Sequence, residues 1–471
     1  MNIFKKLPPA VFYFLVFSIP FGTRKSVWQF TEGFSEYTGV FIYGTDILMI
    51  LFIVWWLLSL RGLAKQSLTN KERLPRLRLL AMTIFIFFAA ISIFFAYSKG
   101  LALYNFSRIL VLAIFALATG GLIKEGIVKI DKILMALAAS GIFQAIVGFG
   151  QFVRQGSLGL WFLGEPDLSF TGGGIAKIAV EGAKIIRAYG TLPHPNILAA
   201  FLLLGLFGLY YLWLKRSRQY VILSSERRIS RDPSDALRMT TIATSIAIII
   251  LGLILTFSRA AWLAGATMSI LFLGYGLFRR ETRVWAAQLF FIIALSLTAF
   301  IYALHPYIAA RAPILQNEPS VVRRLQYNEM ALELIKNKPL GVGIGNQVIY
   351  SVRTGLYQKF GMDKAWMWEP IHNLYLLIVT ELGVQGGIIF SIFLLSLVYR
   401  ISSLLYSRGR IEVGDSVILI MFLALLFLGL FDHYLWTLQS GRLMLWLIIG
   451  IIMGLTNCNT IYYNDRHENN N

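Results

Sequence analysis

The chain has 471 residues, of which 57% are hydrophobic and 14% are charged, whereas a typical soluble domain has about 25% charged residues. Apolar runs of about 20 residues recur along it, which is the length that a helix needs to cross the hydrocarbon core of a bilayer. The single cysteine, Cys458, excludes an intrachain disulfide and any metal centre built from several cysteines. This composition predicts an all-α polytopic membrane protein.

About 12 membrane-spanning helices are expected, from apolar runs bounded by polar or charged residues. The first run follows Lys5 and Lys6, and it is interpreted as a retained helix because no small-residue cleavage site comes after it. In chain order, the expected spans are residues 8–22, 40–60, 79–97, 101–122, 132–153, 195–214, 239–257, 261–278, 284–304, 371–399, 415–431 and 441–456.

The excess of 43 lysine and arginine residues over 24 aspartate and glutamate residues follows the expected topology. With a cytoplasmic N-terminus, most basic residues lie in inner segments, such as residues 61–78 and 215–238, and few lie in short outer segments. This is the positive-inside bias that orients membrane proteins. The charge is therefore explained by membrane topology rather than by nucleic-acid binding. Residues 1–456 are expected to form one membrane domain, and residues 457–471 a polar cytoplasmic tail.

Two outer loops, residues 154–194 and 305–370, are too long for this charge rule to explain their basic residues. The first loop is rich in glycine. Within the second, residues 320–338 have apolar positions at i, i+3, i+4, i+7 and i+8, which predicts an amphipathic helix that ends before Pro339. Such a helix would lie over the bundle or in the lipid interface. Its apolar positions are Tyr327, Met330, Ala331, Leu334 and Ile335.

A glycine-rich run, residues 341–346, follows this helix. It is not a phosphate-binding loop or a dinucleotide fingerprint, because no strand precedes it and no Gly-Lys-Ser/Thr follows it. A tight turn with exposed backbone is the expected structure.

Four charged sites stand out because a charge inside a bilayer costs at least a few kcal/mol. One of them, Asp432-His433, begins the turn between the last two expected spans, at the outer face. Asp46 and Arg108 lie inside expected spans, where an interhelical ion pair or hydrogen bonds are the simplest explanation. Arg259 lies between two spans at the expected outer face, with no acid adjacent in the sequence. A guanidinium in that position suits an anion such as phosphate, which it can bind through two parallel hydrogen bonds.

A second basic pair, Arg323 and Arg324, begins the expected loop helix, and both residues flank its apolar stripe. An anion clamp, an exposed solvated face and contact with lipid headgroups all fit this pattern.

Histidines gather at the outer ends of spans. They do not have the i, i+3 or i, i+4 spacing of metal ligands on one helix, so no metal and no other cofactor is expected. His372 opens an expected span and is a candidate general base, because an imidazole titrates near neutral pH; the alternative is a packing residue at a helix end. His194 lies between two prolines, which favours a structural role or a wall of the site. The four histidines concerned are His194, His305, His372 and His433.

Several separated motifs together resemble the bacterial O-antigen ligase and polymerase superfamily, whose members are polytopic glycosyltransferases of the C-type fold group. Each motif is short, but their order and their placement at outer ends of spans form a specific set. The matching segments are residues 189–199, 256–264, 324–343, 372–375, 381–383 and 432–436.

The resemblance implies transfer of a glycan from an undecaprenyl-diphosphate carrier at the outer face of the cytoplasmic membrane. The acceptor would be a hydroxyl of a lipid, a glycan or a protein, and no nucleotide sugar or metal would be needed. At matching positions, Arg259 would hold the diphosphate and Arg324 would be a second clamp, with its neighbour Arg323 less favoured. His372 would take the proton from the acceptor hydroxyl. Further residues that could form walls of the site are His194, Asn196, Asn373, Asp432 and His433.

A transporter or lipid-linked glycan flippase is the alternative class, since such proteins can also have about 12 spans. Transporters often show paired repeats and broken helices near the midplane of the membrane. The sequence shows no internal repeat, and its polar clusters lie at the expected outer ends of spans, which favours an enzyme.

Overall fold

The computed structural model describes residues 3–32, 35–63, 76–169, 174–225, 233–313, 318–407 and 413–455. In these ranges, seven helices are long and apolar enough to cross a membrane, judged by length and composition, and five further apolar helices are shorter. The chain is therefore a multi-pass membrane protein. The expected tail, residues 457–471, lies outside the described residues.

Each expected span coincides with an apolar helix, although the number of 12 membrane crossings remains a prediction. These helices are α1 (Ile3–Ser18), α2 (Gly44–Leu63), α3 (Arg76–Ile91), α4 (Lys99–Lys124), α5 (Ile130–Arg154), α6 (Pro195–Ser225), α7 (Pro233–Leu255), α8 (Arg259–Phe278), α9 (Arg283–Ala303), α14 (Leu374–Ser407), α15 (Val413–Gly429) and α17 (Gln439–Gly454).

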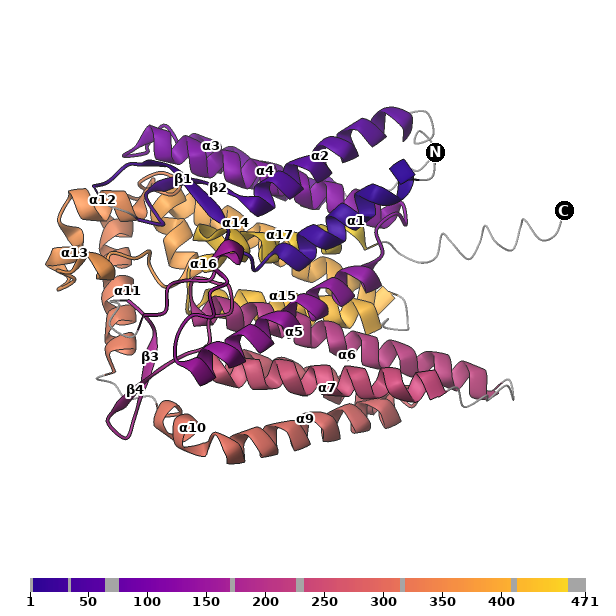
Figure 1. The fold of residues 1–471 in the computed structure, drawn as a ribbon. Helices are drawn as coiled ribbons and strands as arrows, with labels where there is room; N and C mark the ends of the chain where they lie inside the picture. The colour runs from indigo at the N-terminus through magenta and orange to yellow at the C-terminus, as the bar shows by residue number, and fades with distance from the viewer. Residues whose placement is uncertain are drawn as a thin grey trace.

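The shorter elements gather at one end of the bundle, opposite the end that carries both chain termini (Figure 1). They are β1 (Arg24–Gln29), β2 (Gly39–Tyr43), η1 (Trp161–Leu163), β3 (Lys177–Val180), β4 (Ala183–Ile186), α10 (His305–Arg311), α11 (Pro319–Asn337), α12 (Gln347–Arg353), α13 (Leu356–Lys359), η2 (Ala365–Met367) and α16 (Tyr434–Thr437).

Two antiparallel hairpins, β1–β2 and β3–β4, correct the all-α expectation. The second hairpin turns at Glu181 and Gly182, which both have positive φ angles of 49° and 84°. Two such residues form the turn that matches the twist of a two-residue hairpin. Both hairpins belong to the segments between helices, so the membrane part of the fold remains helical.

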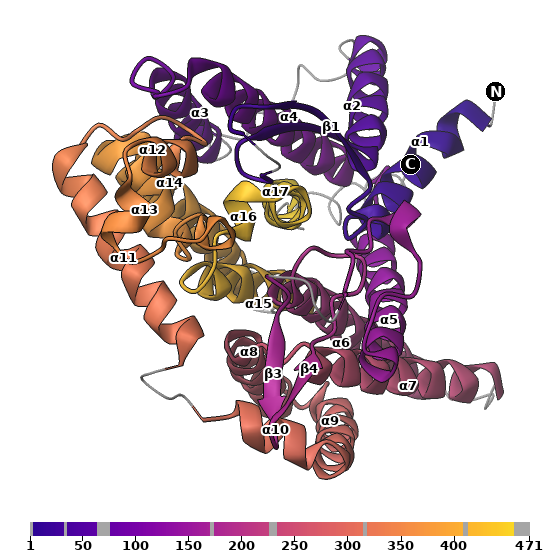
Figure 2. The same ribbon diagram turned by 60° about the vertical axis from the view of Figure 1, so that its left-hand side comes forward.

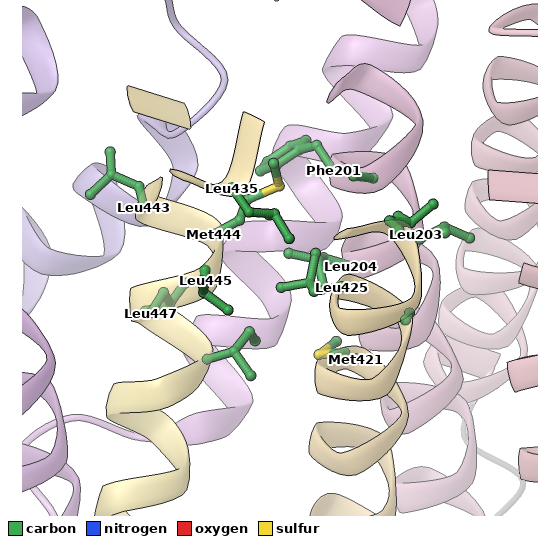
Figure 3. Close-up of a cluster of buried hydrophobic side chains, with 14 of the residues drawn as sticks. Phe201, Leu203, Leu204, Met421, Leu425, Leu435, Leu443, Met444, Leu445 and Leu447 are labelled. Carbon is green, nitrogen blue, oxygen red and sulfur yellow. The ribbon is translucent and has the colours of Figure 1, made fainter. Parts of the chain in front are cut away.

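α17 lies at the centre of the bundle (Figure 2) and is buried along its whole length. It packs closely on α4, because Gly450 and Gly454 face Gly120 with backbone atoms in near contact. Small residues spaced four apart allow helices to approach closely in membranes, where packing replaces the hydrophobic effect between helices. Figure 3 shows side chains of α6, α15 and α17 meeting in this core, among them Phe201 and Leu425.

The expected loop helix is confirmed as α11, which packs against α14. Its buried residues include four of the five predicted apolar positions, and Ile335 is half-buried. The helix therefore lies over the bundle through its apolar stripe.

The glycine-rich run that follows α11 forms the expected tight turn and fills a break in α14. α14 is interrupted at Gly383, whose φ and ψ angles are 77° and 172°. The N–H groups of Val342 and Gly343 donate to the carbonyls of Thr380 and Glu381, at 3.0 and 2.9 Å. Irregular backbone is tolerated in a membrane bundle where protein satisfies its polar groups. The break thus leaves these two carbonyls occupied, unlike the open ion sites of broken transporter helices.

Replacement of Gly343 by alanine is expected to destabilise the fold strongly. Gly343 has a φ angle of 95°, and an added Cβ would overlap Ala96 of the α3–α4 connection. Gly126 is a matched control, because it has a φ angle of 69° and no atom within 4 Å of its added Cβ. Thermal unfolding in detergent should show Gly343→Ala to be less stable than Gly126→Ala by about 1–3 kcal/mol, the usual cost of overpacking. Equal stability of the two variants would contradict the tight approach.

The expected intramembrane ion pair is confirmed. The guanidinium of Arg108 on α4 donates to Asp46 Oδ2 on α2 at 2.6 Å, and Gln439 on α17 donates to Asp46 Oδ1 at 2.8 Å. Both charges are buried, so each satisfies the other and neither is available for chemistry.

Candidate active site

A cavity of about 1150 Å³ opens among the short elements at the loop end of the bundle. Its walls come from the β1–β2 connection, from η1 and the segment after it, from the start of α6, and from the residues at the N-terminal ends of α14 and α16. Residues of three predicted motifs meet in this cavity, although they are far apart in the sequence. They are His194, His372, Asp432 and His433.

His372 lies in the loop that precedes α14, and Asn373 is the last residue of that loop. The side chain of Asn373 accepts hydrogen bonds from the N–H groups of Tyr375 and Leu376, at 3.0 and 3.1 Å, so it caps the helix. Asn373 is absent from the cavity lining, so this capping contact replaces the expected wall role. The cap fixes where the helix begins and therefore where His372 is presented.

The imidazole of His372 is held by three contacts. Its Nδ1 lies 2.9 Å from the carbonyl oxygen of Pro370, so Nδ1 carries the proton and donates. Nε2 is left with its lone pair, 3.4 Å from Glu369 Oε2. The ring stacks on Tyr327 of α11 with a centroid distance of 4.8 Å and an interplanar angle of 3°. This geometry gives His372 one basic nitrogen in the tautomer that a general base requires.

His433 packs edge-on against His372, with ring centroids 4.9 Å apart. Its Nδ1 lies 2.7 Å from the Thr437 hydroxyl. Asp432 accepts hydrogen bonds from the His433 N–H and from the Asn196 side chain, both at 2.9 Å. Of the expected wall residues, Asp432 and His433 therefore lie beside His372. Asn196 holds Asp432 in place through its hydrogen bond.

Burial keeps two of these histidines neutral. Burial is the main reason that the pKa of His433 is lowered to about 3, and a proton on the neighbouring His372 contributes to the lowering. Burial, with a contribution from the Arg187 charge, lowers the pKa of His194 to about 3. In the unfolded chain each imidazole would instead titrate near 6.5.

The stability of the protein is expected to fall in acid because of this difference. Below about pH 6.5 the unfolded state binds a proton at His433 that the folded state does not bind until its pKa of about 3, so stability present above pH 6.5 is lost on acidification. Melting temperatures in detergent should decline from pH 7 towards pH 4, and less steeply in His433→Asn. The exposed His305 offers the control variant His305→Asn, and an unchanged slope in His433→Asn would contradict burial of a neutral imidazole.

The loop that carries His194 is positioned by a buried glutamine on α5. Gln151 accepts from the N–H groups of Tyr189 and Gly190, at 3.0 and 2.8 Å, and donates to the Gly190 carbonyl at 2.7 Å. Further along, Asn196 donates its backbone N–H to His194 Nδ1 at 3.1 Å. These contacts hold residues 189–196 rigidly against the bundle, and so they fix one wall of the cavity.

A group of arginines surrounds the α7–α8 turn, beside this wall. Arg187 donates to the carbonyl of Thr256 and to the side chain of Asn196, at 2.6 and 2.9 Å. Arg311 donates to the carbonyl of Phe257 at 3.2 Å, and Arg259 begins α8. Burial lowers the pKa of Arg187 to about 9, and the positive charge of Arg311 adds to the effect. Several cations held this closely indicate a place for an anion.

No acid is adjacent to Arg259 in the sequence, but the fold places one beside it. Glu318 Oε2 lies 2.7 Å from the Arg259 guanidinium, and its other oxygen binds Arg311. Burial alone would raise the pKa of Glu318, but hydrogen bonds from Ser320, Arg259 and Arg311 outweigh it and lower the pKa to about 2. The acid lies almost 60 positions away in the sequence, so the local pattern around Arg259 could not reveal it.

The structure separates Arg323 from Arg324. Arg323 lies over the Trp366 ring at 4.7 Å, on the side of Glu369. Arg324 faces the other way, and its charge acts on Arg187 and His194. The Nε atom of Arg324 is buried and has no hydrogen-bond partner among the described residues. A buried donor without a partner costs about 1–3 kcal/mol, which a bound anion would recover.

Residues 244–391 match the family model described as O-antigen ligase. This match places residues 244–391 in the O-antigen ligase and polymerase superfamily. The matched segment runs from within α7 to within α14, so it contains Arg259, Arg324 and His372. No curated protein matches the chain.

Three potential metal ligands also lie together at the cavity. His372, Asp432 and His433 each bring a donor atom to within 4.8 Å of the others. Helical spacing in the sequence did not reveal this group, because His372 lies just before α14, whereas Asp432 and His433 lie just before α16. A group of this kind can hold a metal ion, so the sequence argument against a metal was incomplete.

Four residues of the site were not expected from the sequence: Arg187, Arg311, Glu318 and Tyr37. Tyr37 comes from the β1–β2 connection, and its ring lies 5.5 Å from that of His433. Arg187 lies two residues before a motif that was recognised, so its position was a usable signal. The other three gave no signal, because only the fold brings Tyr37 to the cavity, and Arg311 and Glu318 to the α7–α8 turn.

Proposed function

We propose that this protein transfers a glycan from an undecaprenyl-diphosphate carrier to an acceptor hydroxyl at the outer face of the cytoplasmic membrane. The superfamily supports an enzyme of ligase or polymerase type in a membrane. The observation that carries the proposal is the position of His372, which has a basic Nε2 at a cavity beside a group of buried and half-buried arginines. An acceptor can enter through the cavity, and a diphosphate suits the arginines.

In the proposed reaction, the acceptor hydroxyl oxygen attacks the anomeric carbon of the donor while His372 Nε2 takes its proton. The bond between the anomeric carbon and the diphosphate oxygen breaks, and its electron pair leaves with the diphosphate. The growing negative charge is stabilised by Arg324, Arg259 and their neighbours, which is the larger contribution in reactions of this kind. Direct displacement of this type inverts the anomeric configuration.

Glu369 is proposed to stabilise the protonated base. Its carboxyl oxygen lies 3.4 Å from the same His372 nitrogen that takes the proton. When His372 is protonated, the Glu369 carboxylate at this distance stabilises the positive charge of the imidazolium. In the usual catalytic triad the acid binds the other ring nitrogen, whereas here the Pro370 carbonyl has that place.

We propose a metal-free reaction, because a metal bound by His372 would occupy the lone pair that must take the proton. The test is transfer by purified protein of a glycan from an undecaprenyl-diphosphate donor to oligosaccharide, lipid and peptide acceptors, with and without a chelator. Transfer that persists in chelator, with release of undecaprenyl diphosphate, is the expected result. Loss of transfer in chelator would contradict the metal-free reaction. Movement of intact donor across vesicles without its cleavage would instead support a flippase.

A further inference from the structure

The cavity has an acidic lining, although the protein as a whole is strongly basic. Among the described residues, its lining contains two basic side chains, Arg24 and Arg353, and six acidic ones. Arg24 forms an ion pair with Glu36 from the same lining. The six acidic side chains are Glu32, Glu36, Glu165, Asp167, Glu369 and Asp432.

Some of the acidic side chains form hydrogen bonds or ion pairs within the protein, and the others face the cavity. Glu165 accepts hydrogen bonds from the N–H groups of Leu158 and Leu160, at 2.7 and 2.6 Å, so it organises the η1 segment. Glu32 and Asp167 are exposed at the cavity. Together with Glu369 and Asp432 at the histidines, they give the cavity a negative charge that Arg353 only partly offsets.

Aromatic side chains line the same space from two directions. Trp161 and Phe162 of η1 are 77% and 53% exposed, and Trp366 of η2 is 45% exposed. Their backbone is fixed, since the Thr23 hydroxyl donates to the Phe162 carbonyl at 2.7 Å. Arg323 lies over Trp366 and holds that ring. An aromatic face with polar groups beside it suits a sugar ring, which has an apolar C–H face and a polar edge.

The positively charged and the negatively charged side chains of the site lie in different places. The arginines that suit a diphosphate, Arg187, Arg259, Arg311 and Arg324, are absent from the cavity lining. Arg187 is linked to the cavity through Asn196, which in turn binds Asp432. His372 faces the acidic side. A cleft lined by one sign of charge concentrates ligands of opposite charge, repels ligands of like charge and does neither to neutral ligands.

We propose that the cavity selects an acceptor glycan that is neutral or carries amino groups, and that its acidic lining rejects glycans with uronic acid or phosphate groups. This inference rests on the proposed transferase function. The aromatic walls would bind the sugar rings of either kind of glycan. Discrimination would arise from repulsion of the wrong acceptor, which is a common source of specificity.

The experiment compares two oligosaccharide acceptors of the same linkage and length, one neutral and one with a hexuronic acid in place of a hexose. With purified protein and one undecaprenyl-diphosphate donor, kcat/KM at low salt is expected to be at least about 10-fold lower for the acidic acceptor. Added salt should narrow this ratio, because screening shortens the range of repulsion. The double variant Asp167→Asn, Glu32→Gln should bring the kcat/KM values of the two acceptors closer together at low salt. Glu333→Gln is the control, since Glu333 pairs with Lys359 outside the cavity lining, and it should leave the ratio unchanged.

Equal kcat/KM for both acceptors at low salt would overturn the inference while leaving the transferase function intact. A ratio that neither salt nor the double variant changes would also overturn it, because the preference would then arise from shape. Transfer to neither acceptor would overturn the proposed function, and this inference with it.

Discussion

His372→Ala is expected to lower the rate of glycan transfer by about 10²–10⁴-fold, the usual contribution of a general base. The expectation rests on the Nδ1 contact with Pro370, which leaves Nε2 as the basic nitrogen at the cavity. The loss should appear in kcat at saturating donor and acceptor, because the base acts in the transition state. Initial rates of glycan transfer in detergent provide the measurement.

His305→Ala is the matched control, since His305 is exposed at the start of α10 and outside the cavity lining. It should retain the wild-type rate. The melting temperature of His372→Ala must be checked as well, because removal of the ring also removes its stacking on Tyr327. A folded His372→Ala protein with full activity would remove His372 as the base.

Arg324→Ala is expected to reduce the rate of transfer by about 10²–10³-fold. Removal of one preorganised group that stabilises developing charge usually has an effect of this size. The buried Nε of Arg324 without a hydrogen-bond partner is the reason to choose this arginine. Both kcat and the apparent affinity for the donor should fall, whereas the KM for the acceptor should change little. Kinetics with varied donor concentration would measure this separation.

Arg323→Ala provides a control in the neighbouring position. Arg323 lies over Trp366, so its loss is expected to change acceptor binding more than donor binding. An equal effect of the two substitutions on donor kinetics would contradict the assignment of Arg324 to the diphosphate side. Arg259→Lys adds a further test, because lysine keeps the charge but cannot bind the diphosphate through two parallel hydrogen bonds.

The sequence predicted the helices well, because long apolar runs and the period of α11 carry their own signal. It did not predict the hairpins β1–β2 and β3–β4, which are short and lie between strong helix patterns. Nor did it predict the break in α14 at Gly383. That break depends on the turn of residues 341–346, which packs against it from a separate segment.

The site was predicted in part. His372, Asp432 and His433 were recognised because each lies at the end of an apolar run, and the fold brings them together. The capping role of Asn373 was missed, although a residue of this type just before a helix is a common cap. The pairing of Arg259 with Glu318 could not be predicted, because it depends on how α10 and α11 fold back onto the α7–α8 turn.

That pairing has a consequence for what the resting protein can bind. Anionic phospholipid headgroups are abundant at a membrane surface, and most carry one negative charge. Glu318 already supplies one negative charge to Arg259 and Arg311, so a singly charged headgroup gains little by replacing it. A diphosphate brings more charge and more oxygen acceptors, so it can compete with the carboxylate. We infer that Glu318 competes with singly charged headgroups for Arg259 and Arg311, at the place where the proposed diphosphate would bind.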